Sequence, residues 1–476
     1  MAELLKPDIC VIGAGSGGLS VAAAAAAFGV PVVLVEKGKM GGDCLNTGCV
    51  PSKSLIAAGK RARAISGAGA FGVSAGALEV DFGKVQRHVH EVIAAIEPND
   101  SKERFTGLGV RVIAGVARFR NRRSVLVGDG IEIRARRFVV ATGSSPALPS
   151  IPGLASVPYL TNETVFDLTQ RPEHLIVIGA GPVGLELAQA FFRLGAAVTV
   201  LEAARPLARE DDECADVVLD ALVREGVRLR SGVTIVRVES SDGSRPRLVV
   251  RDGDREETIE GSHLLVAAGR RPNVEGLGLD EAHIKHEPAG IRVNWRLRTS
   301  NRRVYAIGDV VGAAQFTHVA NYHAGIVIRN VVFRLRAEVN EDIVPRVTFT
   351  DPELAHVGLT EAEARSRRHE VRVLRWPYHE NDRAQAERET VGHIKVVTDG
   401  KGVVLGATIV GAAAGELITA WALAVGERLN VRAFAGMIVP YPTLAEIGKR
   451  AAITYFTPSL TGNWVRRIIR WLRRLG

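Results

Sequence analysis

Cysteine and long apolar runs are both scarce in this sequence. Its 476 residues include four cysteines, Cys10, Cys44, Cys49 and Cys214, which is too few for the disulfide framework of a secreted protein. No stretch reaches the ~18 consecutive apolar residues typical of a membrane-spanning helix, and the N-terminus lacks the basic-then-apolar order of a signal peptide. We therefore expect a cytoplasmic protein.

Acidic residues are outnumbered by basic ones, 52 to 61, which gives a net charge of +9. Five arginines fall in residues 464–476, a stretch without an acidic residue, so the rest of the chain is only mildly basic. This balance gives no reason to expect a nucleic-acid partner. Hydrophobic residues make up 46% and charged residues 24%, an ordinary globular composition, and the length suggests about three domains.

One glycine-rich motif occurs twice in the chain. Residues 8–19 read DICVIGAGSGGL and residues 174–185 read HLIVIGAGPVGL. In each copy an apolar strand runs into glycines and then into an alanine-containing helical segment. The glycines are Gly13, Gly15 and Gly18 in the first copy, and Gly179, Gly181 and Gly184 in the second.

Each copy also continues to a second apolar strand that ends on a glutamate, Glu36 or Glu202. Strand, glycines, helix and a later acid form a dinucleotide-binding fingerprint, in which the pyrophosphate lies at the helix N-terminus and the acid binds ribose hydroxyls. A glycine-rich turn without a ligand is the alternative for one copy, and the matched second copy argues against it. Two copies predict FAD and a nicotinamide nucleotide.

Glu202 favours NAD(H) over NADP(H), because a carboxylate at this position repels a 2′-phosphate. Arg205 and Arg209 follow closely in the sequence. Either arginine could bind that phosphate, so the second nucleotide stays open between the two forms.

A pair of cysteines follows the first motif, in GGDCLNTGCVPSK at residues 41–53. On a regular helix Cys44 and Cys49 would be ~7.5 Å apart along the axis, whereas the Cα atoms of a disulfide are ~4.4–6.8 Å apart. A disulfide between them requires a break in the helix, which Gly48 permits. The alternatives are two unrelated thiols or metal ligands, and we expect no metal site because a second ligand pair is missing.

The segment 41–53 resembles the active-site signature of the class I pyridine nucleotide–disulfide oxidoreductases, which include dihydrolipoamide dehydrogenase, glutathione reductase and mercuric reductase. Further segments resemble other parts of the same family, so that the resemblance extends over nearly the whole chain. They are ATGSSP at 141–146, VAAGRRPN at 266–273, TSNRRVYAIGD at 299–309 and VTFTDPELAHVGLTEAEA at 347–364.

The resemblance implies a role for each residue of the signature. Cys49 is the sulfur next to the flavin, held as a thiolate, and Cys44 is the interchange thiol that meets the substrate. Lys53 pairs with Glu186 beside the flavin. Electrons pass from NAD(P)H through FAD to a Cys44–Cys49 disulfide and on to an acceptor. The resemblance also implies cofactor-binding roles for Lys37, Gly42, Thr142, Gly143, Gly269, Gly308, Asp309 and His318.

The C-terminal part departs from the family pattern. Dihydrolipoamide dehydrogenases and glutathione reductases carry His-Pro-Thr-x-x-Glu, contributed by the partner subunit, where this chain has Tyr441 and Glu446. Tyrosine titrates near ~10 and is a poor base at neutral pH. Other candidate bases are His318, His323 and His379.

Mercuric reductases resemble this chain in having tyrosine at that place. They also carry a C-terminal cysteine pair and usually an N-terminal metal-binding domain. This sequence has no cysteine after Cys214 and begins at the first strand. Neither dihydrolipoamide nor Hg(II) is therefore selected as the substrate.

The expected fold is α/β, with two Rossmann-like domains and a C-terminal α+β dimerisation domain. The FAD domain spans 1–150 and 275–342, the NAD(P) domain spans 151–274, and the dimerisation domain spans 343–460, with strands near 344–349, 393–397 and 405–410. The resemblance implies a homodimer whose active site is shared between subunits.

Residues 461–476 form a separate basic tail. Its apolar residues recur at helical spacing and its arginines occupy the other face, so it reads as an amphipathic helix able to lie on an anionic membrane. The alternative is a helix docked on the protein's own dimer. The apolar residues are Trp464, Val465, Ile468, Ile469, Leu472 and Leu475, and the arginines are Arg466, Arg467, Arg470, Arg473 and Arg474.

The leading hypothesis is an FAD-dependent NAD(P)H:disulfide oxidoreductase similar to dihydrolipoamide dehydrogenase or mercuric reductase. One alternative is a reductase of metal ions, quinones or reactive oxidants that uses the same electron path. Another is a membrane-docked flavin-binding partner protein with little turnover. The presence of Cys44, Cys49, Lys53 and Glu186 together argues against the last.

Overall fold

The computed structural model describes residues 3–240, 243, 245–367, 370–460 and 462–475. The chain forms two compact units, one built from 1–203 and 230–339 and the other from 204–229 and 340–476. These units are groups of residues that contact one another densely, and their limits do not test where the nucleotide-binding domains begin and end. The domain limits expected from the sequence therefore stay a prediction.

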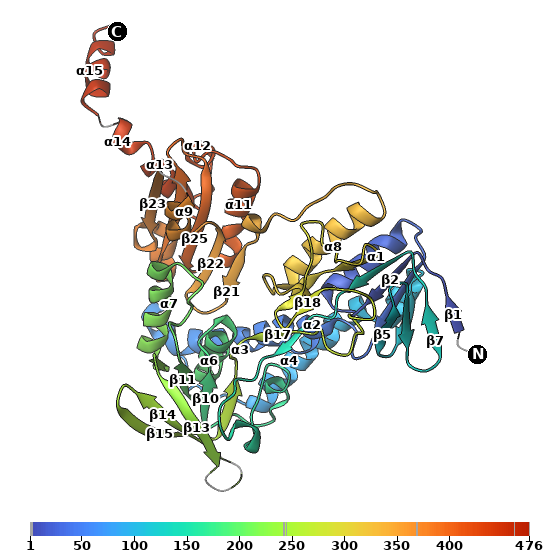
Figure 1. The fold of residues 1–476 in the computed structure, drawn as a ribbon. Coiled ribbons are helices and arrows are strands. Elements are labelled where there is room, and N and C mark those ends of the chain that lie inside the picture. Colours follow the sequence, from blue (N-terminus) through green and yellow to red (C-terminus); the bar gives the residue numbers. More distant parts are fainter. Residues whose placement is uncertain (1–2, 241–242, 244, 368–369, 461, 476) are drawn as a thin grey trace. The chain divides into compact units, whose positions relative to one another are not determined.

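The first unit contains a parallel five-stranded sheet in the order β20-β8-β2-β3-β4. Its central strands are continuous apolar runs because both faces are covered. Helix α1 packs on this sheet beside α8 (Figure 1). The bounds are β2 Ile9–Ile12, β3 Val32–Glu36, β4 Arg111–Ala114, β8 Arg137–Val140, β20 Val304–Ala306, α1 Ser16–Ala27 and α8 Thr317–Val331.

The same plan is repeated in the second glycine motif, as its sequence predicts. Strand β10 pairs in parallel with β11 on one side and with β16 on the other, and α6 follows β10 and packs on it. The bounds are β10 His174–Ile178, β11 Ala197–Glu202, β16 His263–Val266 and α6 Pro182–Arg193.

Three helices after β3 bring the cysteine segment against the second motif. Helix α2 (Gly42–Asn46) leads into α3 (Cys49–Gly67), and α3 packs on both α4 (Phe82–Ile96) and α6. This packing joins the two nucleotide-binding motifs within one unit, because α2 begins at Gly42, close to Gly15 of the first motif, and α3 rests on the helix of the second.

The second unit is built on an antiparallel five-stranded sheet in the order β21-β22-β25-β24-β23, as expected for an α+β dimerisation domain. Helices α11 and α13 pack on it, and α7 also lies against it (Figure 1). The strands expected near 344–349, 393–397 and 405–410 are confirmed. The bounds are β21 Arg346–Thr348, β22 Glu353–Gly358, β23 Val371–Pro377, β24 His393–Asp399, β25 Val404–Gly411, α7 Asp212–Glu225, α11 Ala414–Gly426 and α13 Glu446–Thr454.

The remaining elements complete both units or connect their parts. The strands are β1 Glu3–Leu5, β5 Ala117–Asn121, β6 Ser124–Val127, β7 Ile131–Ile133, β9 Ser144–Pro146, β12 Arg228–Ser231, β13 Thr234–Ser240, β14 Pro246–Asp252, β15 Arg255–Glu260, β17 Arg270–Pro272, β18 His286–Glu287 and β19 Gly290–Ile291; the helices are α5 Lys102–Gly107, α9 Glu361–Arg367, α10 Asp382–Glu387, α12 Arg432–Gly436, α14 Thr457–Leu460 and α15 Asn463–Leu472.

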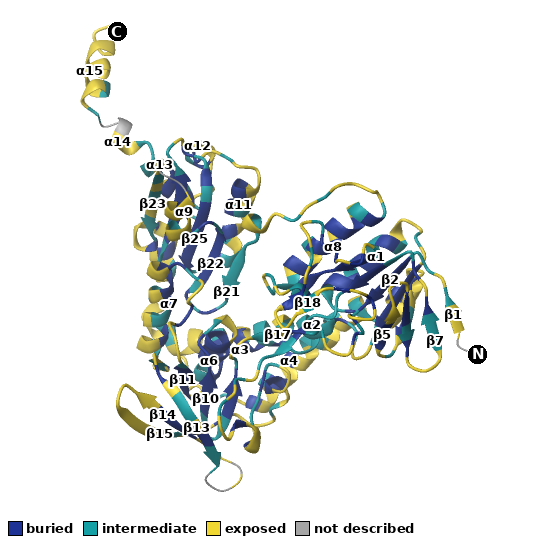
Figure 2. Cartoon of the chain, viewed as in Figure 1, coloured by how far each residue is buried: buried dark blue, intermediate teal, exposed yellow. Residues whose placement is uncertain are grey.

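The predicted amphipathic tail is helical. Helix α15 contains no buried residue, and both its arginines and its large apolar side chains are exposed (Figure 2). Within the described residues, no helix combines the length and the apolar character required to cross a bilayer.

Candidate active site

Two glycine cradles lie at the N-termini of α1 and α6. A Cβ added to Gly15 or Gly181 would meet no protein atom within 4 Å, and neither helix has a side-chain cap. The open space and the uncapped amides fit a pyrophosphate that approaches the backbone closely. Each cradle therefore fits the pyrophosphate of a dinucleotide.

The other glycines of each motif are required by packing. A Cβ on Gly18 would lie 1.9 Å from the carbonyl oxygen of Gly13, and one on Gly184 would lie 2.1 Å from that of Gly179. Gly13 and Gly179 both have a φ of 106°, in the region that favours glycine. These four positions therefore shape the turn and let the helix approach the strand.

The two glutamates of the fingerprint occupy equivalent positions at the ends of β3 and β11. Glu36 Oε2 accepts the backbone N–H of Ala14 at 2.5 Å, and Glu202 Oε2 accepts that of Ala180 at 2.8 Å. Each carboxylate is thus held beside its glycine turn, where a ribose would lie.

Asp309 belongs to a half-buried cluster of polar side chains, and the sequence analysis identified only Asp309 itself. Its Oδ2 accepts the Ser144 hydroxyl at 2.6 Å and lies 3.9 Å from Arg270 Nε. Burial raises the pKa of Asp309, and the hydrogen bond from Ser144 and the charge of Arg270 oppose this rise. Arg270 also reaches Asp43 at 3.1 Å, which links this group to the cysteine segment.

The chain breaks its helix between the two cysteines, as a bridge between them would require. Cys44 lies in α2, the break falls at Thr47 and Gly48, and Cys49 is the first residue of α3. The side chain of Asp43 accepts the Thr47 hydroxyl at 2.7 Å and stabilises the break. All four cysteines of the chain are free thiols here.

The two sulfurs of the pair differ in acidity. The hydrogen bond from Cys44 is the main cause that lowers the pKa of Cys49 to about 6, against the opposing effect of burial; Thr317 and Lys53 lower it further. The same hydrogen bond raises the pKa of Cys44. The reduced pair therefore holds one proton on Cys44 and a thiolate at Cys49.

Thr317 is a site residue that the sequence analysis missed. It is the first residue of α8, and its hydroxyl lies 3.4 Å from the Cys49 sulfur. The sequence offers one indication of this role, because Thr317 directly precedes His318 and follows the segment around Asp309.

Lys53 and Glu186 form the ion pair that the resemblance implies. Lys53 lies one turn after Cys49 on α3, and its Nζ is 2.6 Å from Glu186 Oε2 on α6. The Glu186 side chain is 6% exposed, so its charge needs this partner. The pair places a cation within one helical turn of the thiolate.

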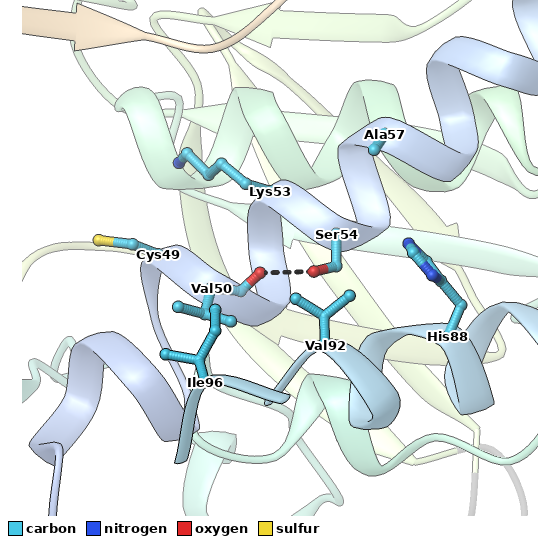
Figure 3. A pocket seen from close by; sticks show the side chains of 8 residues that line it. All are labelled: Cys49, Val50, Lys53, Ser54, Ala57, His88, Val92 and Ile96. Atoms are coloured by element: carbon cyan, nitrogen blue, oxygen red, sulfur yellow. Dashed lines mark hydrogen bonds between the residues drawn. The ribbon is translucent and has the colours of Figure 1, made fainter. Parts of the chain in front are cut away.

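An open pocket of about 420 Å³ reaches Cys49 between α3 and α4. Figure 3 shows Cys49 at one end and His88 at the other, with apolar side chains between them. No sequence motif marks His88. The lining residues are Cys49, Val50, Lys53, Ser54, Ala57, His88, Val92 and Ile96.

Tyr441 and Glu446 have different partners in the second unit. The Tyr441 hydroxyl donates to Asp382 Oδ2 at 2.8 Å, and this carboxylate raises the pKa of Tyr441. Glu446 begins α13 and lies 3.4 Å from Arg450. Asp382, the first residue of α10, carries no motif and was missed by the sequence analysis.

The three histidines considered as bases lie in unlike surroundings. His323 is buried on α8, its Nδ1 accepts the Gly308 N–H at 3.2 Å, and burial lowers its pKa to about 4. It serves as a neutral acceptor. His318 stacks on Phe316 with ring centroids 5.3 Å apart, and the backbone carbonyl of His379 accepts from Gln385.

The remaining predicted cofactor residues lie on turns of the first unit. Gly42 approaches Gly15 so closely that a Cβ on Gly42 would lie 2.7 Å from the Gly15 Cα. The Thr142 hydroxyl donates to the carbonyl of Asn273 at 2.9 Å. Lys37 follows β3, and positive φ angles occur at Gly143, Gly269 and Gly308.

Comparison with known proteins identifies the same family along the chain. Residues 7–324 match the family described as pyridine nucleotide-disulphide oxidoreductase, and residues 344–452 match its dimerisation domain. A mercuric reductase from Bacillus cereus is 37% identical over 451 residues, which cover 94% of this chain and 71% of that protein. A dihydrolipoyl dehydrogenase from Bacillus subtilis is 32% identical over 446 residues, covering 92% and 96%.

A solved structure shares the fold over the same length. The Cu(II) complex of the HOCl-induced flavoprotein disulfide reductase RclA from Escherichia coli superposes with a TM-score of 0.85, at 26% identity, and covers 94% of this chain and 99% of that one. The matched domains support FAD as cofactor and a homodimer as the assembly. The chain belongs to the pyridine nucleotide-disulphide oxidoreductase family and is an NAD(P)H-dependent flavoprotein disulfide reductase.

Proposed function

We propose that this enzyme uses NADH to reduce a Cys44–Cys49 disulfide and passes the electrons through Cys44 to an oxidised acceptor. The observation that carries the proposal is that the Thr317 hydroxyl and the Lys53–Glu186 ion pair lie beside Cys49, which makes Cys49 the more acidic of the two sulfurs. A disulfide that takes up a hydride equivalent becomes one thiol and one thiolate, which balances atoms and charge. The site favours that product, with the proton at Cys44 and the charge at Cys49.

Bound FAD supplies the two-electron relay between the nicotinamide and the disulfide. The protein residues then have separate tasks. Lys53 and Thr317 stabilise the negative charge on Cys49, and Glu186 holds Lys53 in place. Cys44 carries the proton of the reduced pair and gives it up, to solvent or to the leaving group of the acceptor, as its sulfur attacks.

The choice between substrate classes follows from the poor base at residue 441. Oxidising a dithiol substrate requires a group that removes its proton at neutral pH. The Tyr441 hydroxyl donates a hydrogen bond to Asp382, which raises the pKa of Tyr441. The same group would serve the reverse reaction, so an acceptor that exchanges no proton with the site, such as a metal ion, is favoured over dithiol oxidation.

Steady-state NADH oxidation with a panel of acceptors tests this proposal. We expect turnover with at least one oxidised acceptor among disulfides, Cu(II), Hg(II) and quinones, and its loss in both Cys44→Ser and Cys49→Ser. Turnover that survives in both variants would show that electrons bypass the cysteine pair.

We propose NADH as the preferred donor because Glu202 is fixed at the end of β11. The backbone N–H of Ala180 donates to the Glu202 carboxylate and holds it beside the second glycine turn, which supports the proposal because a carboxylate beside the ribose repels a 2′-phosphate. Comparison of kcat/KM for NADH and NADPH tests this preference.

We also propose that α15 attaches the enzyme to anionic membrane. Its arginines and its large apolar side chains are exposed together, and both are needed for a helix that lies in a lipid interface. Each arginine near an anionic surface adds ~1 kcal/mol. Co-sedimentation with anionic and neutral vesicles tests the attachment, which should occur with the anionic vesicles.

A further inference from the structure

Arg205 is bound to two carboxylates of α7. It follows Glu202 by three residues in the sequence. Its Nε lies 3.1 Å from Asp212 Oδ1, and one terminal nitrogen lies 2.8 Å from Asp216 Oδ1 and donates to the backbone carbonyl of Asp212 at 3.3 Å. The Nε atom and one terminal nitrogen of the guanidinium are thereby bound by acceptors of this one helix.

Helix α7 is a fixed support for these two acids. Asp211 caps the helix by accepting the Cys214 N–H, and both its carboxylate oxygens accept Lys395 Nζ, at 3.0 and 2.8 Å. The side chains of Asp211 and Lys395 are each 6% exposed. A buried, doubly bonded ion pair is costly to break, so the first turn of α7 is held on the sheet of the second unit (Figure 1).

The segment between Arg205 and α7 is also anchored. Leu207 is buried. Arg346 binds the Glu210 carboxylate at 2.9 Å and donates to the backbone carbonyl of Arg209 at 2.9 Å. Arg205 and its acidic partners therefore meet across a short segment whose conformation is already fixed.

We propose that Asp212 and Asp216 are specificity-determining residues that keep Arg205 from binding a 2′-phosphate. The inference rests on the proposed preference for NADH. An arginine just after the second strand of the fingerprint is the group that accommodates the 2′-phosphate of NADP(H). Here that arginine is already neutralised, and its carboxylate partners would repel the phosphate.

The size of the effect is modest because the ion pairs are partly exposed. The side chains of Arg205, Asp212 and Asp216 are 44%, 77% and 60% exposed. Each exposed ion pair changes an equilibrium by only a few fold. We therefore expect the loss of both pairs to raise kcat/KM for NADPH about tenfold.

The test compares Asp212→Asn/Asp216→Asn with the wild-type holoenzyme. We expect kcat/KM for NADPH to rise about tenfold while that for NADH changes little. Inhibition by adenosine 2′,5′-bisphosphate should tighten by a similar factor, whereas inhibition by adenosine 5′-monophosphate should not. Adding Arg205→Gln should remove both gains, and Arg209→Gln should not.

A matched control removes the same charge from the other end of the same helix, in Asp220→Asn/Glu225→Gln. FAD content and melting temperature identify any variant that is misfolded. The inference is overturned if kcat/KM for NADPH does not rise in a folded double variant. It is also overturned if this value rises equally in the control, or if the rise persists after Arg205→Gln is added. A wild-type preference for NADPH would instead overturn the proposed donor.

Discussion

At the scale of single residues, the chemistry of the site depends on which of the two sulfurs carries the proton of the reduced pair. Cys44 and Cys49 have the same chemistry in isolation, yet Cys49 gains a hydrogen bond from Cys44, a neighbouring hydroxyl and a cation one turn away. Their surroundings, rather than their identity, decide which sulfur attacks and which carries charge.

Replacing Thr317 with valine should raise the pKa of Cys49 above its value of about 6. A hydrogen bond to a charged group corresponds to about one pKa unit. Thiolate is present above this pKa and is lost as the pH falls through it, so the variant should lose thiolate at a higher pH. The rate of Cys49 alkylation against pH, compared between the reduced variant and the reduced wild type with Cys44 in place and the alkylated residue identified by mass spectrometry, measures the shift.

Thr317→Ser is the control, because it keeps the hydroxyl and should restore most of the wild-type profile. An unchanged profile in Thr317→Val would mean that the contact at 3.4 Å contributes nothing to the acidity of Cys49.

Replacing Tyr441 with histidine should speed the oxidation of dihydrolipoamide. The imidazole titrates near neutral pH and would have the Asp382 carboxylate as a partner, whereas Tyr441 has a raised pKa. A positioned base contributes roughly 10²–10⁴-fold, so even a partial gain is measurable in kcat at about pH 7.5. Adding Asp382→Asn should reduce that gain.

Fast dihydrolipoamide oxidation by the wild type, unchanged by Tyr441→His, would contradict this expectation. It would show that a different group, such as His379, serves as the base.

At the scale of elements, the strand–turn–helix units assign different tasks to glycines only three residues apart. A Cβ at Gly181 points into open space, whereas one at Gly184 would collide with the Gly179 carbonyl. The first position is kept open for a ligand and the second for the packing of α6 on β10.

Gly181→Ala should therefore weaken nucleotide binding without unfolding the protein. We expect the KM for NADH to rise roughly tenfold, because the methyl group obstructs the pyrophosphate, while FAD content and melting temperature stay near those of the wild type. Gly184→Ala should lower the melting temperature instead. Equal destabilisation by both substitutions would contradict this division of tasks.

At the scale of the whole molecule, the tail should be separable from catalysis and assembly. A chain that ends at Leu460 lacks α15, whose residues are all outside the core, so it should remain a dimer that retains FAD and NADH oxidation. It should no longer co-sediment with anionic vesicles. Light scattering and flotation at low and high salt measure both properties, since screening weakens the attraction.

A truncated chain that dissociates into monomers would assign the tail to the dimer instead. Full-length protein that ignores anionic vesicles would likewise refute the membrane proposal.

The sequence alone determined the fold class, the two nucleotide-binding motifs and the cysteine segment. These features depend on local patterns: glycines at fixed spacing before a helix, an acid after the next strand, and two cysteines around Gly48. Local spacing is readable because it is set by backbone geometry within a few turns of chain.

Only the tertiary structure brought Thr317 to Cys49, Asp382 to Tyr441, and Asp212 with Asp216 to Arg205. The first pair is separated by 268 residues and the second by 59, so no local pattern connects them. The acids of α7 are near Arg205 in sequence, but their contact depends on where the buried Lys395–Asp211 pair holds the helix. Long-range packing decides which side chains meet, and the electrostatics of the site follow from those meetings.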